Sequence, residues 1–67
     1  MNRYKVTHYG YEVTEHLTNA RNPREAIRKT IGGLGDLGKQ VWKQGLLTRF
    51  GYNGKVLVDV RCVGRAK

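Results

Sequence analysis

The residues of this sequence that are best suited to chemistry are its cations, and one group of them has helical spacing. Arg24, Arg28 and Lys29 follow Arg21 by three, seven and eight residues. On a helix this spacing lets several of these side chains reach one surface. Only Glu25 lies among them to neutralise their charge. We therefore expect a cationic surface on the helix that can bind phosphate groups.

A second cationic group surrounds the only tryptophan of the chain. Lys39 and Lys43 flank Trp42 on its two sides. Proteins that bind single-stranded nucleic acids combine cations that neutralise the backbone with aromatic rings on which bases stack. We therefore predict that Lys39, Trp42 and Lys43 contribute to the same binding surface. In the alternative interpretation, Trp42 belongs to the small core or anchors a protein partner.

The net charge of the chain is strongly positive. Its 67 residues include 13 Lys and Arg but only five Asp and Glu, which gives a formal net charge of +8. Such a charge attracts polyanions and acidic protein surfaces over long distances. The expected partner is therefore nucleic acid, RNA or DNA, or an acidic protein surface. A basic composition can also serve solubility alone.

Cofactor, metal and catalytic sites find no support in the sequence. Residues 33–38 match the G-x-G-x-x-G motif of dinucleotide-binding folds, but they follow a predicted helix and not a parallel strand. Cys62, His8 and His16 are fewer than the four ligands of a structural zinc site. Serine is absent and the acids are scattered along the chain. We expect a protein that is not an enzyme and holds neither a metal nor a cofactor.

The elements that must position the cations begin with two strands. Residues 4–9 alternate in polarity with a period of two, and residues 11–18 do the same, with a glycine between them for a tight reversal. We expect an antiparallel hairpin. Its apolar face would include Tyr11, Val13 and Leu17, and its polar face would be solvated.

The clearest helix start in the chain lies at Pro23. Asn22 is a favourable N-cap, proline suits the first helical position, and Glu25 can reach back to the cap. We expect this helix to cover the sheet and to end at the glycines of residues 32 and 33. Its apolar stripe consists of Ala26, Ile27, Thr30, Ile31 and Leu34.

The segment after the helix is rich in glycine and carries the weakest signal. Gly35 and Gly38 would each destabilise a helix by about 1 kcal/mol. We therefore predict a flexible loop over about residues 32–45, part of which is irregular structure leading into the next strand. Such a loop could move on binding.

The last third of the chain holds the strongest turn signal, the Asn-Gly pair of residues 53–54. A two-residue turn there would place Arg49 on the same face as the valines that follow. A three-residue loop with a bulge at the glycine instead places Phe50 opposite Val56, and we expect this bulged form. The resulting apolar face consists of Leu46, Phe50, Val56, Val58, Val60 and Cys62.

These elements predict one α+β domain over residues 1–67. Its antiparallel sheet would have three or four strands, in the order β-β-α-β-β or β-β-α-β, with one helix packed across one face. The unpaired edges of the sheet could also join two copies into a dimer. The order of elements and the segment from Ala20 to Ala26 resemble two groups of small proteins. These are archaeal ribosomal accessory proteins of β-β-α-β build and short phage proteins that bind host RNA polymerase. No functional residue is carried over from either group.

The expected function is non-enzymatic binding of nucleic acid, mainly through phosphate contacts from the basic helix face and the Lys/Trp loop. The alternative is a regulator or inhibitor, similar to the phage type, that binds an acidic surface of a larger machine such as RNA polymerase. No run approaches the ~18 apolar residues of a membrane span. We therefore expect a cytoplasmic protein without membrane contact.

Overall fold

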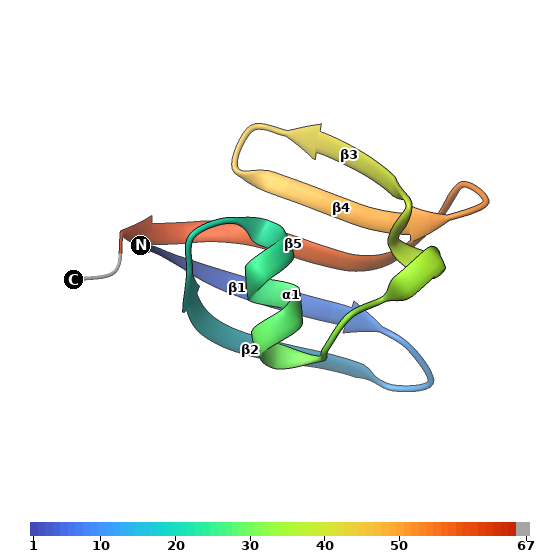
Figure 1. Ribbon diagram of the computed structural model, residues 1–67, viewed down its shortest axis with the longest axis horizontal. Helices are drawn as coiled ribbons and strands as arrows, with labels where there is room; N and C mark the ends of the chain where they lie inside the picture. The colour runs from blue at the N-terminus through green and yellow to red at the C-terminus, as the bar shows by residue number, and fades with distance from the viewer. Residues whose placement is uncertain (66–67) are drawn as a thin grey trace.

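The chain forms a five-stranded antiparallel sheet with one α-helix on one of its faces (Figure 1). The computed structural model describes the backbone of residues 1–65 and the side chains of residues 1–35 and 38–65. The predicted α+β class, with an antiparallel sheet and one packed helix, is confirmed. The elements are β1 (Asn2–Tyr9), β2 (Val13–Ala20), α1 (Pro23–Thr30), the 3-10 helix η1 (Gly35–Gly38), β3 (Gln40–Gln44), β4 (Leu47–Tyr52) and β5 (Lys55–Arg65).

The sheet contains one strand more than expected. Its strands lie in the order β2-β1-β5-β4-β3, and all neighbours are antiparallel. The additional strand is β3, which occupies residues 40–44, where irregular structure was predicted. The glycines of this segment do not interrupt the strand because they lie before or after it. Gly45, with a φ of 60°, lets β3 turn back into β4.

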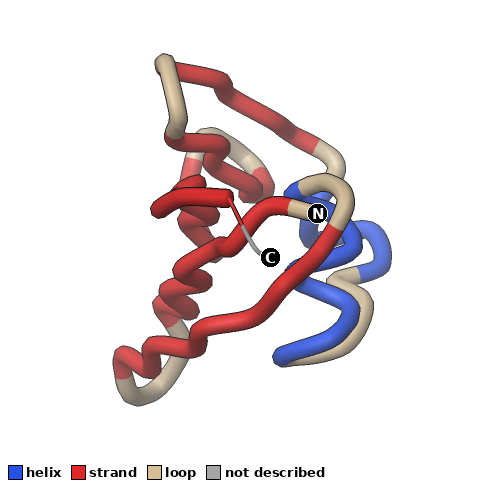
Figure 2. The backbone as a smooth tube through the Cα atoms, turned by 90° about the vertical axis from the view of Figure 1, so that its left-hand side faces the viewer, coloured by secondary structure: helices blue, strands red, loops and turns tan. Residues whose placement is uncertain are grey.

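The two sides of the sheet differ in what covers them. Both α1 and η1 lie on the same side (Figure 2), which we call the covered face; the other side is the open face. The core lies on the covered face, where Val6, Val58 and Val60 have no exposed surface. Ala26 and Ile27 of α1 pack into this cluster. A helix of eight residues covers only a thin core, so a domain of this size has little stability to spare.

The first hairpin forms as predicted, but β2 turns its other side inward. Val6 lies directly opposite His16, so the even-numbered residues of β2 belong to the covered face. Val13 and Leu17 lie on the open face, where they are 63% and 59% exposed. The expected inward face of Tyr11, Val13 and Leu17 is wrong. The length of the connection between the strands decides which side turns inward, and the alternation of residue types does not reveal it.

The hairpin of β4 and β5 turns at Asn53 and Gly54. Their φ values are 52° and 77°. Positive φ at both central residues identifies a two-residue type I′ turn. Tyr52 accordingly pairs with Lys55, and the predicted three-residue loop is wrong.

A β-bulge follows this turn and corrects the register. Gly51 pairs with Val56, but the next pair is Phe50 with Val58, which leaves Leu57 as the extra residue. Beyond the bulge, Phe50 and Val58 are buried in the core, as the predicted apolar face requires. Val56 does not join them and borders a hollow of the open face instead.

The helix α1 begins where the sequence predicts. The side-chain oxygen of Asn22 accepts a hydrogen bond of 2.8 Å from the backbone N–H of Glu25. Glu25 reaches back past the cap, and its carboxylate accepts a bond of 3.2 Å from the N–H of Arg21. The helix closes at Gly32, whose φ is 83° and whose N–H donates to the carbonyl of Ile27. No helix in residues 1–65 is long and apolar enough to cross a membrane.

The bulge predicts that Gly51→Ala destabilises the fold. A Cβ at Gly51 would overlap the backbone carbonyl of Lys55 and approach the ring of Trp42 to 3.0 Å. We expect a loss of about 1–3 kcal/mol in the free energy of unfolding, measured by urea denaturation. Gly33→Ala is the matched control, because a Cβ there has no neighbour within 4 Å. Equal stability of the two variants would contradict the assigned register.

Candidate functional site

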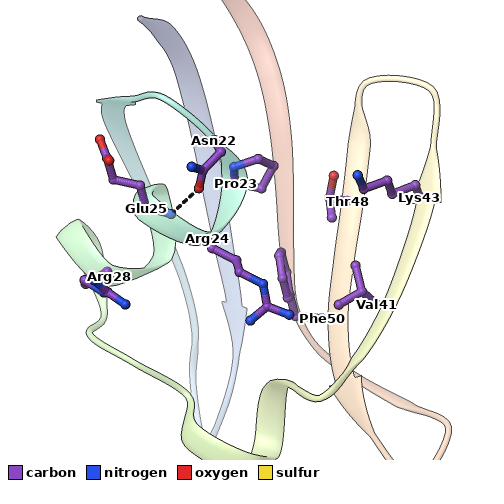
Figure 3. A pocket seen from close by; sticks show the side chains of 9 residues that line it. All are labelled: Asn22, Pro23, Arg24, Glu25, Arg28, Val41, Lys43, Thr48 and Phe50. Carbon is purple, nitrogen blue, oxygen red and sulfur yellow. Dashed lines mark hydrogen bonds between the residues drawn. The ribbon is translucent and has the colours of Figure 1, made fainter.

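A hollow of about 560 Å³ lies on the covered side of the molecule, between the first turn of α1 and the strands β3 and β4 (Figure 3). Phe50 and Val41 supply apolar parts of its lining, and Pro23 borders it from the helix. Three of the six other lining residues are cations. The hollow is therefore an apolar depression with a positively charged rim.

Three cations line the hollow, Arg24 and Arg28 from α1 and Lys43 from β3. Figure 3 shows Arg24 reaching from the helix toward β4, where its guanidinium lies 5.4 Å from the centre of the Phe50 ring. This cation–π contact holds Arg24 over the hollow. Within residues 1–65, none of the three cations forms an ion pair. Their charge is therefore available to a ligand.

Glu25 is the one acid among the residues that line the hollow, and it is engaged elsewhere. Figure 3 shows its carboxylate turned away from β3 and β4. The carboxylate accepts the bond from the N–H of Arg21 and lies 3.4 Å from the Nζ of Lys29. The bond from Arg21 first, and Lys29 second, lower the pKa of Glu25 below its ordinary value. Glu25 thus remains charged without neutralising the three cations.

A hydroxyl on a buried residue, that of Thr48, faces the same hollow. Thr48 of β4 is 7% exposed and lies directly opposite Lys43 in the β3–β4 ladder. Its hydroxyl forms no hydrogen bond with any residue that the structure describes. Solvent reaches the hydroxyl itself, so it is an available donor and acceptor on the residue opposite Lys43.

This lining suits the binding of an anion. Two guanidinium groups, an amine and a hydroxyl are hydrogen-bond donors, and charge-assisted bonds to phosphate or carboxylate oxygens are the strongest that such groups form. The lining contains no base beside the Thr48 hydroxyl that could activate it as a nucleophile. No group of three or more metal-ligating side chains lies close together in the described part of the chain.

The structure brings together three of the seven predicted site residues: Arg24, Arg28 and Lys43. Arg21 precedes the helix cap and does not line the hollow. Lys29 points to the other side of α1, where it donates a hydrogen bond of 2.9 Å to the backbone carbonyl of Asn19 and pairs with Glu25. Lys39 lies between η1 and β3, also outside the hollow.

Trp42 does not share a surface with Lys43. Both belong to β3 and not to a loop, and neighbouring residues of a strand point to opposite faces. Trp42 lies on the open face, directly opposite Arg49, and its ring packs beside Gly51. The expected Lys/Trp loop is therefore replaced by a strand that divides these residues between the two faces.

Sequence reasoning missed Thr48 and Phe50 as site residues. It placed Phe50 on the apolar face of the last hairpin, which assigned that residue to the core, and it gave Thr48 no role in binding. The signal that could have identified Thr48 is a hydroxyl among inward-facing apolar residues. The position of the hollow could not be predicted, because it depends on β3, which the sequence did not reveal.

No family model matches the chain, and neither the curated proteins nor the solved structures contain a match.

The helix start predicts a pH-dependent contribution of Glu25 to stability. Because its pKa is lower in the folded protein than the usual 4.5, its interactions stabilise the fold above that pH and are lost as the pH falls through the folded pKa. Glu25→Gln should therefore unfold at lower urea than the parent at pH 7, and the difference should shrink toward pH 3. Glu12→Gln, in the exposed β1–β2 connection, corrects for the loss of one charge. A difference that is equal at both pH values would disprove this role.

Proposed function

We propose that the protein binds nucleic acid and that a backbone phosphate occupies the hollow between α1 and the strands β3 and β4. The observation that carries this proposal is that three cations without an ion pair to any described residue line one hollow, which the solvent-accessible hydroxyl of Thr48 also lines. Guanidinium groups bind phosphate oxygens in pairs, an amine adds a point charge, and a hydroxyl donates one further bond. The lining therefore matches the chemistry of a phosphate.

The distribution of ion pairs also supports this site. On the open face, Lys5 lies 3.1 Å from Glu15, and Arg49 lies 3.4 Å from Asp59. Both acids of that face are thus balanced by cations of their own chain. The uncompensated charge of a protein with net charge +8 includes the rim of the hollow. A phosphate is attracted there over long distances and meets donors without competing partners.

Recognition through phosphates is largely independent of the base sequence. Cations that neutralise phosphates release counterions, so the affinity falls steeply as the salt concentration rises. Phosphate contacts position a nucleic acid and carry no sequence information directly. The proposal is therefore a salt-sensitive binding protein of low sequence specificity, which acts on RNA or DNA without chemistry.

The second candidate function is that of a regulator that binds an acidic surface of a larger protein. The observation that favours it is the outer edge of β3, whose residues are all exposed and whose second side pairs with no strand of the described chain. An exposed edge can accept a strand from a partner. If this function holds, a pull-down from nuclease-treated lysate retains one stoichiometric protein. If no such protein is retained, this candidate is rejected.

The proposed phosphate site predicts that neutralising its cations weakens binding more than neutralising others. The test variant combines Arg24→Gln, Arg28→Gln and Lys43→Gln. Fluorescence anisotropy with labelled single-stranded RNA, duplex DNA and an unrelated polyanion, each over a salt series, should show at least a tenfold loss of nucleic-acid affinity for this variant. The slope of log affinity against log salt concentration should become shallower by roughly 0.7–0.9 for each phosphate that the variant no longer neutralises.

The matched control removes the same charge elsewhere. It combines Arg21→Gln, Lys55→Gln and Arg65→Gln, three exposed residues that line neither this hollow nor the hollow of the open face. Its affinity should remain closer to that of the parent protein. Equal losses in both variants would show that only net charge matters. If the parent binds nucleic acid no more tightly than it binds the unrelated polyanion, the proposed function is rejected in favour of a protein partner.

Thr48→Val separates binding from stability at the same site. Valine has nearly the shape of threonine without the hydroxyl, and removing a hydroxyl that bonds to no described residue should leave the free energy of unfolding unchanged or slightly raised. The affinity for nucleic acid should nevertheless fall by about 1 kcal/mol, the value of one hydrogen bond. Urea unfolding and anisotropy measure the two effects. Unchanged affinity would remove Thr48 from the site.

A further inference from the structure

The open face of the sheet carries several large apolar side chains that are exposed. In the described part of the chain, ten large apolar or aromatic side chains are exposed, and five of them lie on this face. Apolar side chains that cluster on one surface mark an interaction site, whereas scattered ones do not. The five are Tyr9, Val13, Leu17, Trp42 and Val63.

Three of these side chains, Tyr9, Val13 and Val63, line a hollow that crosses the open face from β2 to β4, and Leu47 of β4 lines it too. In the strand register Leu17 is opposite Lys5, Lys5 is opposite Arg61, and Arg61 is opposite Leu47. Two leucines therefore lie on either side of two cations.

The open face carries charges of both signs. Lys5 pairs with Glu15, and Asp59 lies between Arg49 and the hydroxyl of Tyr9, which donates to it at 2.8 Å. In a twofold dimer each surface meets an identical one, so a surface that carries both signs can be complementary to itself. The rim of the phosphate hollow, with its three unpaired cations, would instead repel a second copy.

From these observations we infer that a second copy of this chain covers the open face, in a twofold dimer in which the two sheets pack face to face. Sheets that pack in this way are about 10 Å apart and bury apolar side chains between them. Five strands at a spacing of about 4.8 Å, each about 25 Å long, have a projected area of the order of 600 Å². The accessible area of such a side-chain surface exceeds its projection and approaches the ~800 Å² per partner of a standard interface.

Arg3 and Arg61 of the open face form no ion pair with a described residue and oppose this arrangement, but most of the remaining net charge of each copy does not. The unpaired cations around the phosphate hollow lie on the covered side of the sheet, and in the dimer they point away from the interface. At physiological salt the screening length is about 8 Å, less than the 18 Å of the shortest dimension of one copy. Repulsion between the two outer surfaces is therefore largely screened. This inference does not depend on the proposed function.

The test is sedimentation velocity of the full chain in about 0.15 M salt, at concentrations from about 1 μM to about 1 mM. The parent should shift with concentration from 7.6 kDa toward twice that mass. Leu17→Lys places a charge on the open face and should raise the dissociation constant of the dimer at least tenfold. Leu46→Lys is the matched control, because Leu46 is 70% exposed and lies in the β3–β4 turn, outside the strands of the open face. This control should dimerise as the parent does.

A second measurement keeps the inference testable if Leu17→Lys fails to fold. Amide chemical shifts of the parent, recorded on dilution, should change for β1, β2 and β5 and stay constant for the outer edge of β3. A monomer at every concentration, shift changes confined to the edge of β3, or equal weakening by both lysine variants would overturn the inference. Shift changes on the open face that require added nucleic acid would assign this face to nucleic acid and also overturn it.

Discussion

The pairing of β4 with β5 is the constraint on which the rest of the structure depends. Side chains alternate between the faces of a sheet, so a slip of one residue would exchange the buried and exposed sets. Phe50 and Val58 would then leave the core, and Arg49 and Asp59 would face the helix. The type I′ turn by itself produces this unfavourable register, and the bulge at Gly51 corrects it. Only glycine fits there, because a Cβ would overlap the neighbouring backbone.

Once this register is set, the two faces acquire different chemistry. The covered face holds the valine core under α1, and at its margin the helix leaves a hollow toward β3 and β4. Thr48 lies at this margin, and solvent reaches its hydroxyl although the residue is only 7% exposed. The packing of the sheet thus leaves one hydrogen-bonding group that faces the proposed phosphate site.

The parts of the fold that the sequence predicts well are those with a local physical cause. The start of α1 follows from Asn22 and Pro23, which satisfy the helix cap without help from the rest of the chain. The turn at Asn53 and Gly54 follows from the left-handed conformation that these residue types tolerate. The extra strand β3 was missed because its residues are all exposed and it is stabilised mainly by pairing with β4.

The composition of the candidate site likewise depends on contacts between segments that are far apart in the sequence. The helical spacing correctly placed Arg24 and Arg28 on one surface, since that spacing is a local property. Lys43 joins them only because β3 folds back beside α1, and Trp42 leaves them because neighbours in a strand point to opposite faces. Which face each side chain occupies depends on loop lengths and on the bulge. The periodicity of the sequence shows that side chains alternate between the two faces of a strand, but it does not show which set of residues faces the core.

The hollow and the proposed dimer interface lie on opposite faces of the sheet, and this arrangement affects the affinity expected for nucleic acid. In a dimer joined through the open faces, the two proposed phosphate hollows would lie on opposite outer sides, each with its own three cations. One such hollow with a few charge-assisted bonds would bind a phosphate weakly, since exposed cations also interact with salt. If one nucleic acid can reach both hollows of the dimer, binding at the second hollow becomes intramolecular. This can raise the overall affinity by about 10²–10⁴ although each hollow makes the same contacts as before. A short strand that reaches only one hollow gains nothing, so a bivalent protein of this build favours long or folded nucleic acids over short ones.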